Sequence, residues 1–192
     1  MDKAVFIHPT SVIDAGAVIG PGTKIWHFSH LMPGCKVGNH CNIGQNVFID
    51  NNVVIGNGVK IQNNVSVYNG VIIEDAVFLG PSVVFTNVIN PRSFIERKNE
   101  FRKTIIHQGA TIGANATIIC GTDIGAYAMI GAGSVVTKNV KPFALVYGNP
   151  ARQQGWVSKA GIKLAFSEDL KAFCPHSGEE YRLKNNQLLT DY

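Results

Sequence analysis

An aliphatic residue recurs at every sixth position through the first half of the chain. The series keeps one register at Ile7, Ile13, Ile19, Ile25, Leu31, Val37, Ile43, Ile49, Ile55, Ile61, Val67, Ile73 and Leu79. A helix repeats at about 3.6 residues and an exposed strand at 2, so neither explains a strict period of six. A hexapeptide β-solenoid does, because each hexad supplies a short strand and a corner. We therefore expect these side chains to form a continuous inner column.

A second inward position follows each aliphatic residue after four residues. It is small or β-branched, at Ala17, Thr23, Ser29, Cys35, Cys41, Val47, Val53, Val59, Val65, Val71, Val77 and Val83. The residues between the two positions are often Gly, Asn, Asp or Pro, which favour turns, as in residues 19–22 and 55–58. Strands of neighbouring coils should therefore pair in parallel at about 4.8 Å.

The repeat is interrupted after Phe85 and resumes at Ile106. The second series is Ile106, Ile112, Ile118, Ile124, Ile130 and Val136, with the small partners Ala110, Ala116, Thr122, Ala128, Ser134 and Val140. Three hexads per coil give about six coils in an all-β prism roughly 30 Å long. Residues 86–105 should leave this prism as an external loop that encloses a groove. Long loops on a repetitive scaffold are usually functional.

Residues 153–192 lose the repeat. Short apolar runs separated by turn residues indicate small hairpins, with a short helix at 168–173 as the alternative. Such a tail would cover the open end of the prism and its unpaired backbone groups. We expect a β-helix domain at 1–152 and a β-rich C-terminal capping tail at 153–192.

Composition and charge exclude several classes of function. The 192 residues are 45% apolar, and 17 Lys and Arg against 13 Asp and Glu give a formal net charge of +4. This charge is too mild for a nucleic-acid partner. The cysteines show no CxxC spacing, which favours a reducing, cytoplasmic compartment, and no signal peptide or membrane segment is expected. The cysteines are Cys35, Cys41, Cys120 and Cys174, and we expect the first two to belong to the core.

The expected loop is the basic element of the chain. Its charged residues are Arg92, Arg97, Lys98, Arg102 and Lys103 against Glu96 and Glu100. Basic side chains suit phosphates or carboxylates. The alternative is a solvated loop whose mixed charges serve solubility.

Two groups of motifs resemble known enzymes. Residues 147–152 (YGNPAR) match the Gly-x-Pro-Ala-Lys/Arg closing motif of the left-handed β-helix, or hexapeptide-repeat, acyltransferases, and the hexads extend this resemblance over residues 7–151. The left-handed sense follows from the resemblance alone. The chain further resembles the bacterial UDP-2-acetamido-3-amino-2,3-dideoxyglucuronate 3-N-acetyltransferases, in the segments 25–30 (IWHFSH), 59–66 (VKIQNNVS), 85–92 (FTNVINPR), 148–156 and 174–181.

The resemblance implies a reaction and an assembly. The acetyl group of acetyl-CoA would pass to the 3-amino group of the UDP-linked uronate, on the route to diacetamido-uronic acids of surface polysaccharides. The enzyme would be a homotrimer with its active sites between subunits. An acetyltransferase for a dTDP-linked 3-amino-6-deoxyhexose and an O-acetyltransferase are related alternatives. A catalytically silent scaffold is the alternative from another class.

The family's asparagine at the start of the loop falls on Asn87, where the resemblance implies a hydrogen-bond partner that orients the amine. Asn69 and Asn51 stand one and two coils before it, so the alternative is a ladder of asparagines in left-handed turns. Arg92 would meet the carboxylate or pyrophosphate of the substrate. Weaker candidates for contacts with the nucleotide sugar, each with an ordinary corner role as its alternative, are Gln62, Asn63 and Tyr68.

His107 is the rival catalytic residue, because an imidazole just after the loop could accept a proton from the amine. Its alternative is a structural role, and an amine nucleophile lowers the demand for a base. The positions that the resemblance assigns to CoA, through backbone and phosphate-pairing charges, are Ala110, Ala128, Lys138, Lys141 and Arg152. The two lysines are alternatively plain surface residues.

A metal centre is not expected. Zinc enzymes that resemble γ-type carbonic anhydrases share this prism, and their ligand histidines include a pair five positions apart. The six histidines of this chain contain no such pair.

Overall fold

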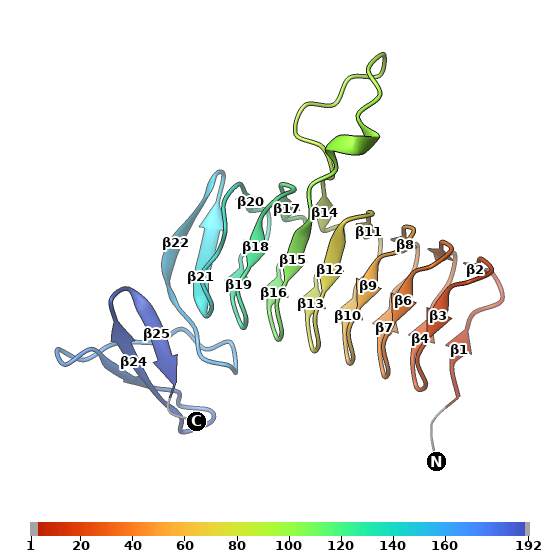
Figure 1. Ribbon diagram of the computed structural model, residues 1–192. Helices are drawn as coiled ribbons and strands as arrows, with labels where there is room; N and C mark the ends of the chain where they lie inside the picture. Colours follow the sequence, from red (N-terminus) through yellow and green to blue (C-terminus); the bar gives the residue numbers. More distant parts are fainter. Residues whose placement is uncertain (1–3, 191–192) are drawn as a thin grey trace.

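The computed structural model describes residues 4–190, which form a three-sided prism with one parallel sheet on each side (Figure 1). Sheet A contains β1 (Phe6–Ile7), β4 (Lys24–Ile25), β7 (Asn42–Ile43), β10 (Lys60–Ile61), β13 (Phe78–Leu79), β16 (Thr111–Ile112), β19 (Met129–Ile130), β21 (Ala144–Gly148) and β22 (Ala151–Trp156). Sheet B contains β2 (Val12–Ile13), β5 (His30–Leu31), β8 (Phe48–Ile49), β11 (Ser66–Val67), β14 (Val84–Phe85), β17 (Thr117–Ile118) and β20 (Val135–Val136). Sheet C contains β3 (Val18–Ile19), β6 (Lys36–Val37), β9 (Val54–Ile55), β12 (Val71–Ile73), β15 (Thr104–Ile106) and β18 (Asp123–Ile124). The expected left-handed parallel β-helix is confirmed.

The inner column lies where the hexads predict it. Ile25, Ile43 and Ile61 occupy equivalent positions in successive strands of sheet A, and each is 0% exposed. Phe85 continues the column at 2% exposure, so the repeat extends one hexad beyond Leu79 before the loop. Ile7 is 40% exposed because it stands in the first coil, which has a neighbouring coil on one side only.

The prism is slightly longer than the hexad count suggested. The strands β1–β18 form six coils of three strands each. A seventh coil consists of β19, β20 and the parallel bridge between Ile124 and Val140. The hexad at Phe85, which the sequence count left out, and the bridge at Val140, which the count took only as the small partner of Val136, account for the difference.

The external loop leaves the prism between β14 and β15, as expected, and contains a single 3-10 turn, η1 (Lys98–Glu100). It extends away from the prism (Figure 1), and a bridge between Arg92 and Ile95 closes its tip. Its ion pairs join loop residues to one another, so the loop is held together internally. The expected groove between the loop and the coils of the same chain stays a prediction.

The C-terminal tail is built from antiparallel strands. The strand β22 pairs with β21 and ends sheet A, and β23 (Lys171–Phe173), β24 (Glu180–Lys184) and β25 (Gln187–Thr190) form a separate sheet. The hairpin interpretation therefore holds over the alternative helix at 168–173. Tyr181 lies edge-on to Phe143, with 6.0 Å between the ring centroids, so this sheet packs on the last coil. The proposed domain boundary after residue 152 falls inside β22.

Residues 4–190 contain no helix that is long and apolar enough to cross a membrane.

Candidate active site

The corners of the prism place the predicted site residues on three separate edges. Each edge is named here by the two sheets that it joins. Asn87 and Tyr68 follow strands of sheet B and lie on the B–C edge, beside the external loop. Gln62 and Asn63 follow β10 and lie on the A–B edge, and His107 follows β15 and lies on the C–A edge. One chain therefore brings Asn87, Tyr68 and the loop together, but not the other three.

The base of the loop is fixed by hydrogen bonds to neighbouring coils. The Thr86 hydroxyl accepts the N–H of Cys120 at 2.9 Å, and the Thr104 hydroxyl accepts the N–H of Gly121 at 3.2 Å. Sequence reasoning missed both threonines. Thr104 nevertheless stands two residues before Ile106, at the small inward position of the repeat, and it is 1% exposed. That position could have identified it.

Arg102 covers the next coil at the end of the loop. Gly121 has a φ of +82°, and a Cβ added there would lie 3.1 Å from Cδ of Arg102. The methylene groups of Arg102 therefore pack against the bare backbone of Gly121. This contact fixes the end of the loop against the coil that follows Asn87.

Asn87 differs from the asparagines beneath it. The side-chain N–H of Asn69 donates to the carbonyl of Asn51 at 2.9 Å, whereas among residues 4–190 the half-buried Asn87 amide has no protein partner. In the two corners that hold Asn51 and Asn69, the left-handed residues are Asn52 and Gly70, with φ of 58° and 91°. Asn51, Asn69 and Asn87 each lie one position earlier, outside the left-handed region. The ladder of left-handed asparagines is therefore wrong, and the Asn87 amide is available to a ligand.

The loop carries unneutralised positive charge. Nη1 of Arg97 donates to both carboxylate oxygens of Glu100, at 2.7 and 2.9 Å. Nζ of Lys98 lies 3.3 Å from Oε1 of Glu96. Both loop carboxylates are thus paired, and Arg92 is exposed, with one guanidinium N–H donating to the carbonyl of Pro91 at 3.2 Å. The loop can therefore offer a guanidinium to an anionic ligand.

His107 is paired with a carboxylate on the C–A edge. Its Nδ1 lies 3.0 Å from Oε1 of Glu74, and Oε2 of Glu74 accepts the backbone N–H of Gln108 at 2.9 Å. A hollow of about 560 Å³ adjoins it and is also lined by Asp123 and Lys141. Because His107 and Asn87 lie at opposite ends of β15, they do not meet within one chain.

Two of the weaker candidates have structural partners. The Asn63 side-chain oxygen accepts the backbone N–H of Gln45 at 2.8 Å, in the same way that Asn57 accepts the N–H of Asn39 on the C–A edge. The Asn63 oxygen therefore has the corner role that was its alternative, whereas its NH₂ group has no protein partner among residues 4–190. The ring of Tyr68 lies 6.1 Å from that of Phe48, centroid to centroid.

Three of the five residues assigned to CoA lie together. Lys138, Lys141 and Arg152 line one hollow of about 270 Å³, next to the last coil. Lys138 is on the B–C edge, like Asn87, and Nζ of Lys141 donates to the carbonyl of Asn186 at 3.0 Å. Three basic side chains around one hollow fit the phosphates of CoA.

Ala110 and Ala128 lie in the core. They are 0% and 1% exposed, and their carbonyl groups accept the N–H of Phe78 and Thr111, respectively. Both residues therefore serve strand pairing and packing, and the structure does not bring them to the basic hollow. Side-chain contact with CoA is excluded by this burial.

Cys35 and Cys41 are also buried in the column, and burial raises the pKa of each thiol. This placement agrees with a core role rather than a nucleophilic one.

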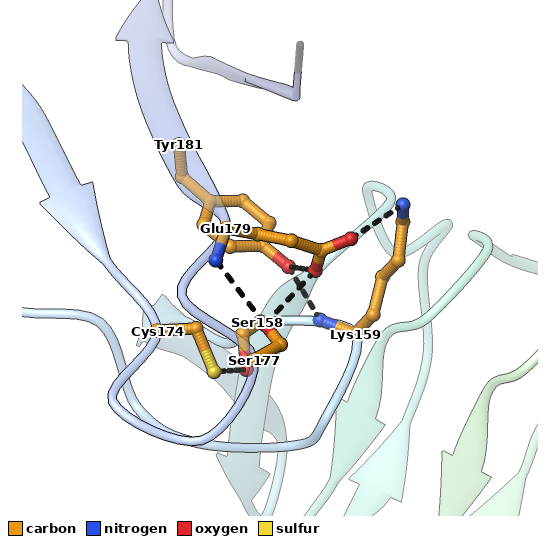
Figure 2. Close-up of polar contacts among 6 residues, drawn as sticks. All are labelled: Ser158, Lys159, Cys174, Ser177, Glu179 and Tyr181. Carbon is orange, nitrogen blue, oxygen red and sulfur yellow. Dashed lines mark hydrogen bonds and ion pairs between the residues drawn. The ribbon is translucent and has the colours of Figure 1, made fainter. Parts of the chain in front are cut away.

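A polar cluster joins two segments of the tail, residues 158–159 and residues 174–181 (Figure 2). The Tyr181 hydroxyl donates to Glu179 at 2.7 Å and accepts the backbone N–H of Lys159 at 2.9 Å. Burial raises the pKa of Tyr181 to about 12, and the Tyr181 hydrogen bond, followed by the Lys159 ammonium, lowers the pKa of Glu179. The Ser158 hydroxyl lowers the pKa of Cys174 to about 7, yet Cys174 is only 1% exposed. Ser158, Cys174 and Tyr181 are buried, whereas Lys159 and Glu179 are partly exposed, so the cluster ties the two segments of the tail together at its surface.

Among residues 4–190, no group of three or more His, Cys, Asp or Glu side chains could hold a metal ion.

Comparison with known proteins adds a family to this geometry. Residues 16–51, 52–87 and 103–138 match the family described as bacterial transferase hexapeptide (six repeats). The chain belongs to this family. It is 46% identical over 180 residues to the dTDP-3-amino-3,6-dideoxy-alpha-D-galactopyranose 3-N-acetyltransferase of Aneurinibacillus thermoaerophilus. The aligned residues make up 94% of this chain and 92% of that relative. The predicted hexapeptide-repeat family and the acetyltransferase class are confirmed.

Solved structures share the fold at lower identity. A point mutant of GDP-perosamine N-acetyl transferase from Caulobacter crescentus, in complex with CoA and GDP-perosamine, matches with a TM-score of 0.56 and 22% identity. WeeI from Acinetobacter baumannii AYE matches with a TM-score of 0.51 and 23% identity. The matches cover 81% and 77% of this chain, and 58% and 56% of those chains.

Proposed function

We propose that this acetyltransferase acetylates the 3-amino group of a nucleotide-linked 3-amino sugar, with UDP-2-acetamido-3-amino-2,3-dideoxyglucuronate as its acceptor. Its class is that of an acetyl-CoA-dependent sugar N-acetyltransferase. We propose in addition which sugar is the acceptor, which residues bind it and how the chains assemble. The placement in surface-polysaccharide synthesis follows from that acceptor.

The arrangement of the B–C edge carries the proposal. Asn87 and Lys138 lie on this edge two coils apart, which is roughly 10 Å at the spacing of paired strands. The phosphates of CoA, bound at Lys138, Lys141 and Arg152, would leave the pantetheine arm free to run along the edge. The thioester would then reach the unpartnered amide of Asn87.

Asn87 can orient the nucleophile without acting as a base. Its side-chain oxygen would accept one N–H of the uncharged amine and so direct the nitrogen lone pair at the thioester carbon. The C–N bond forms as the C–S bond breaks, and the proton leaves the nitrogen for the departing thiolate or for water. A hydroxyl acceptor would need a base beside Asn87, and His107 lies on another edge of the chain. The geometry therefore favours N-acetylation over O-acetylation.

Arg92 supports an acidic acceptor. Its exposed guanidinium stands at the tip of a loop whose two carboxylates are already paired. A planar guanidinium binds carboxylate and phosphate oxygens through paired hydrogen bonds. We propose that it meets the uronate carboxylate, or the pyrophosphate, of the acceptor.

A dTDP-linked 3-amino-6-deoxyhexose is the second candidate acceptor. It is favoured by the relative from Aneurinibacillus thermoaerophilus, whose name specifies a dTDP-3-amino-3,6-dideoxygalactose. Such a sugar has no carboxylate for Arg92. The two acceptors therefore make different demands on the loop.

We further propose a homotrimer with active sites between copies. The loop projects away from its own prism and exposes Phe94 at 81%, Ile95 at 41% and Phe101 at 39% (Figure 1). Exposed apolar side chains on a projecting loop indicate an interaction surface. A neighbouring copy packed against the loop would then complete the binding site on the side that faces away from the loop's own prism. Light scattering should then give the mass of three chains.

The acceptor is tested by measuring CoA release with both sugars. We expect the UDP-linked uronate to give the higher kcat/KM. Arg92→Gln should lower that value and leave turnover of the deoxyhexose unchanged where Arg92 meets the carboxylate, and should lower both values where it meets the pyrophosphate. Lys184→Gln, in the tail, is the matched charge control. A higher kcat/KM for the deoxyhexose would select the second candidate, and no turnover with any nucleotide-linked 3-amino sugar would overturn the proposal.

A further inference from the structure

A stack of aromatic rings stands on the A–B edge near the N-terminal end of the prism. The rings of His8 and His27 are stacked with their centroids 3.5 Å apart, and the ring of Trp26 is nearly parallel to that of His27, at 9°. Trp26 is 37% exposed. We call His8, Trp26 and His27 the aromatic shelf. His8 and His27 are half-buried, and the Trp26 ring lies beside them with its centroid 6.5 Å from that of His27. These three rings contrast with the Gly, Asn and Ser that form most corners of this edge.

A polar hollow of about 250 Å³ adjoins the shelf. It is lined by Trp26, His27 and four amide side chains, Asn42, Gln45, Gln62 and Asn63. No Lys, Arg, Asp or Glu is among its lining residues. A hollow of this kind suits an uncharged, planar ligand with several hydrogen-bonding groups.

Two of the amides are held in a fixed orientation. The Asn42 oxygen accepts the indole N–H of Trp26 at 2.8 Å, and the Asn63 oxygen accepts the backbone N–H of Gln45 at 2.8 Å. Each oxygen is therefore bound to the protein. In the part of the chain from residue 4 to residue 190, the NH₂ groups of Asn42 and Asn63 have no protein partner. They can donate to carbonyl oxygens of a ligand.

We propose that the aromatic shelf and its amides bind the pyrimidine base of the nucleotide sugar. The inference rests on the proposed function and names the part of the acceptor that this site takes. A base stacks on an aromatic face whatever its identity, and amide side chains recognise its edge by hydrogen bonds. The two carbonyl oxygens of uracil or thymine match the two unpartnered NH₂ groups.

Two lysines stand beside the shelf on sheet A. Lys24 and Lys60 are the register partners of Asn42, one on each side, and both are exposed. Ammonium groups one coil above and one coil below Asn42 can bind the diphosphate that follows the base. The hollow and its surroundings thus combine an uncharged base site with charges for phosphate.

The shelf and Asn87 belong to different edges of one prism. Trp26 lies three coils before Asn87, on the A–B edge rather than the B–C edge. A nucleotide sugar joins its base to its amino sugar through a ribose and two phosphates, so the two binding points must lie apart. The inference therefore needs a trimer in which the A–B edge of one copy faces the B–C edge of the next. The base and the amine are then held by different copies.

Tryptophan emission tests the base site directly. The chain contains two tryptophans, and Trp156 is buried at 6% exposure, so the variant Trp156→Phe leaves Trp26 as the only emitter. We expect UDP and dTDP to change its emission in a saturable way. Trp26→Ala should raise the Kd for UDP about 5- to 150-fold in calorimetric titration, the range for loss of one base stack. Trp26→Phe, which retains a ring, should raise it less.

Matched variants and ligands separate this inference from the function itself. Phe173→Ala removes another exposed aromatic residue, in the tail, and should leave the Kd for UDP unchanged. The Kd of Trp26→Ala for CoA should equal that of the wild type. If the wild type binds UDP and acetylates an amino sugar while Trp26→Ala binds UDP normally, the base site is overturned and the function stands. If the wild type binds neither UDP nor dTDP, the proposed acceptor class falls as well.

Mixed trimers test the sharing of one acceptor between copies. Trp26→Ala and Asn87→Ala chains, each weakly active alone, are unfolded and refolded together. We expect part of the activity to return, because some sites then combine an intact shelf with an intact Asn87. Mixed trimers without any gain in activity would show that both residues act within one copy, and would overturn the shared arrangement.

Discussion

The backbone N–H of Arg102 donates a hydrogen bond to the backbone carbonyl of Asn87, with 3.1 Å between the two atoms. This bond joins the last residues of the external loop to the first. Asn87 is therefore fixed by its backbone, while its side-chain amide stays available. Thr86 and Thr104 bind the next coil on either side of this bond.

Replacing Thr104 should weaken this arrangement. Thr104→Val keeps the shape of the side chain but leaves the N–H of Gly121 without its acceptor, which costs about 1–3 kcal/mol at a buried position. Denaturant titration should show this loss, and kcat should fall because Asn87 shifts. Thr111→Val, on an outward position of sheet A, is the control and should change stability by less than about 0.5 kcal/mol. Equal stabilities of the two variants would contradict the role of Thr104.

Asn87→Ala should lower kcat about 100-fold, because removing one positioned hydrogen-bonding group from an active site typically slows the reaction by this factor. The folded structure should persist, since the Asn87 side chain has no protein partner within residues 4–190. CoA release and thermal unfolding measure the two effects. Asn90→Ala, on the exposed part of the loop, should retain wild-type kcat. An Asn87→Ala enzyme with wild-type kcat would remove this residue from the reaction.

His107→Asn should reduce kcat less than Asn87→Ala does, because His107 is bound to Glu74 on a different edge. The pH profile of kcat gives the decisive reading. We expect the wild type and the variant to share one profile. If the variant loses an acidic limb that the wild type shows, His107 is the general base and Asn87 has only an orienting role.

Substitutions in the hollow lined by Lys138, Lys141 and Arg152 should weaken the binding of acetyl-CoA and leave kcat unchanged. Lys138→Gln and Arg152→Gln each remove a charge that is suited to a phosphate, and we expect KM for acetyl-CoA to rise about tenfold. The effect should shrink as the salt concentration rises. Lys163→Gln, outside the hollow, is the control. A lower kcat with unchanged KM would place these residues at another step.

Most of the fold could be predicted from the six-residue period, because the period specifies which side chains pack inside the prism. Every aliphatic residue from Ile25 to Leu79 in the series is at most 3% exposed, since one inward position per hexad leaves a single way to bury the column. The same rule explains why Cys35 and Cys41 are core residues. Sequence reasoning located the loop from the interruption of this series.

The site was less predictable because it depends on contacts that the period does not encode. Arg152 joins Lys138 only because β22 turns back along β21, outside the hexads. The direction of the loop depends on pairs such as Arg97 with Glu100, which are local to the loop. Glu74 meets His107 because β12 pairs with β15 across the inserted loop, which places two corners 33 residues apart in sequence on adjacent coils. Charge and spacing alone could not show which residues share an edge.

Tyr181→Phe should destabilise the tail, because it removes the hydroxyl that joins the tail's two segments. Tyr181 is 0% exposed, and its hydroxyl serves both Glu179 and the N–H of Lys159, so its removal should cost about 1–2 kcal/mol. Because folding raises the pKa of Tyr181 from its ordinary value near 10 to about 12, the stabilisation is complete below about pH 10. It should be lost as the pH rises from 10 to 12. Denaturant midpoints across this range should fall more steeply for the wild type than for the variant.

Alkaline titration identifies the group responsible. Absorbance at tyrosinate wavelengths should show one of the five tyrosines ionising near pH 12, and Tyr181→Phe should abolish this step. Tyr147→Phe, which removes a 45% exposed tyrosine, should leave it in place. If the late step survives in Tyr181→Phe, another tyrosine is the buried one. The hydrogen bonds of Figure 2 would then not hold the tail. If it disappears while the pH dependence of stability persists, the alkaline loss of stability arises from a different group.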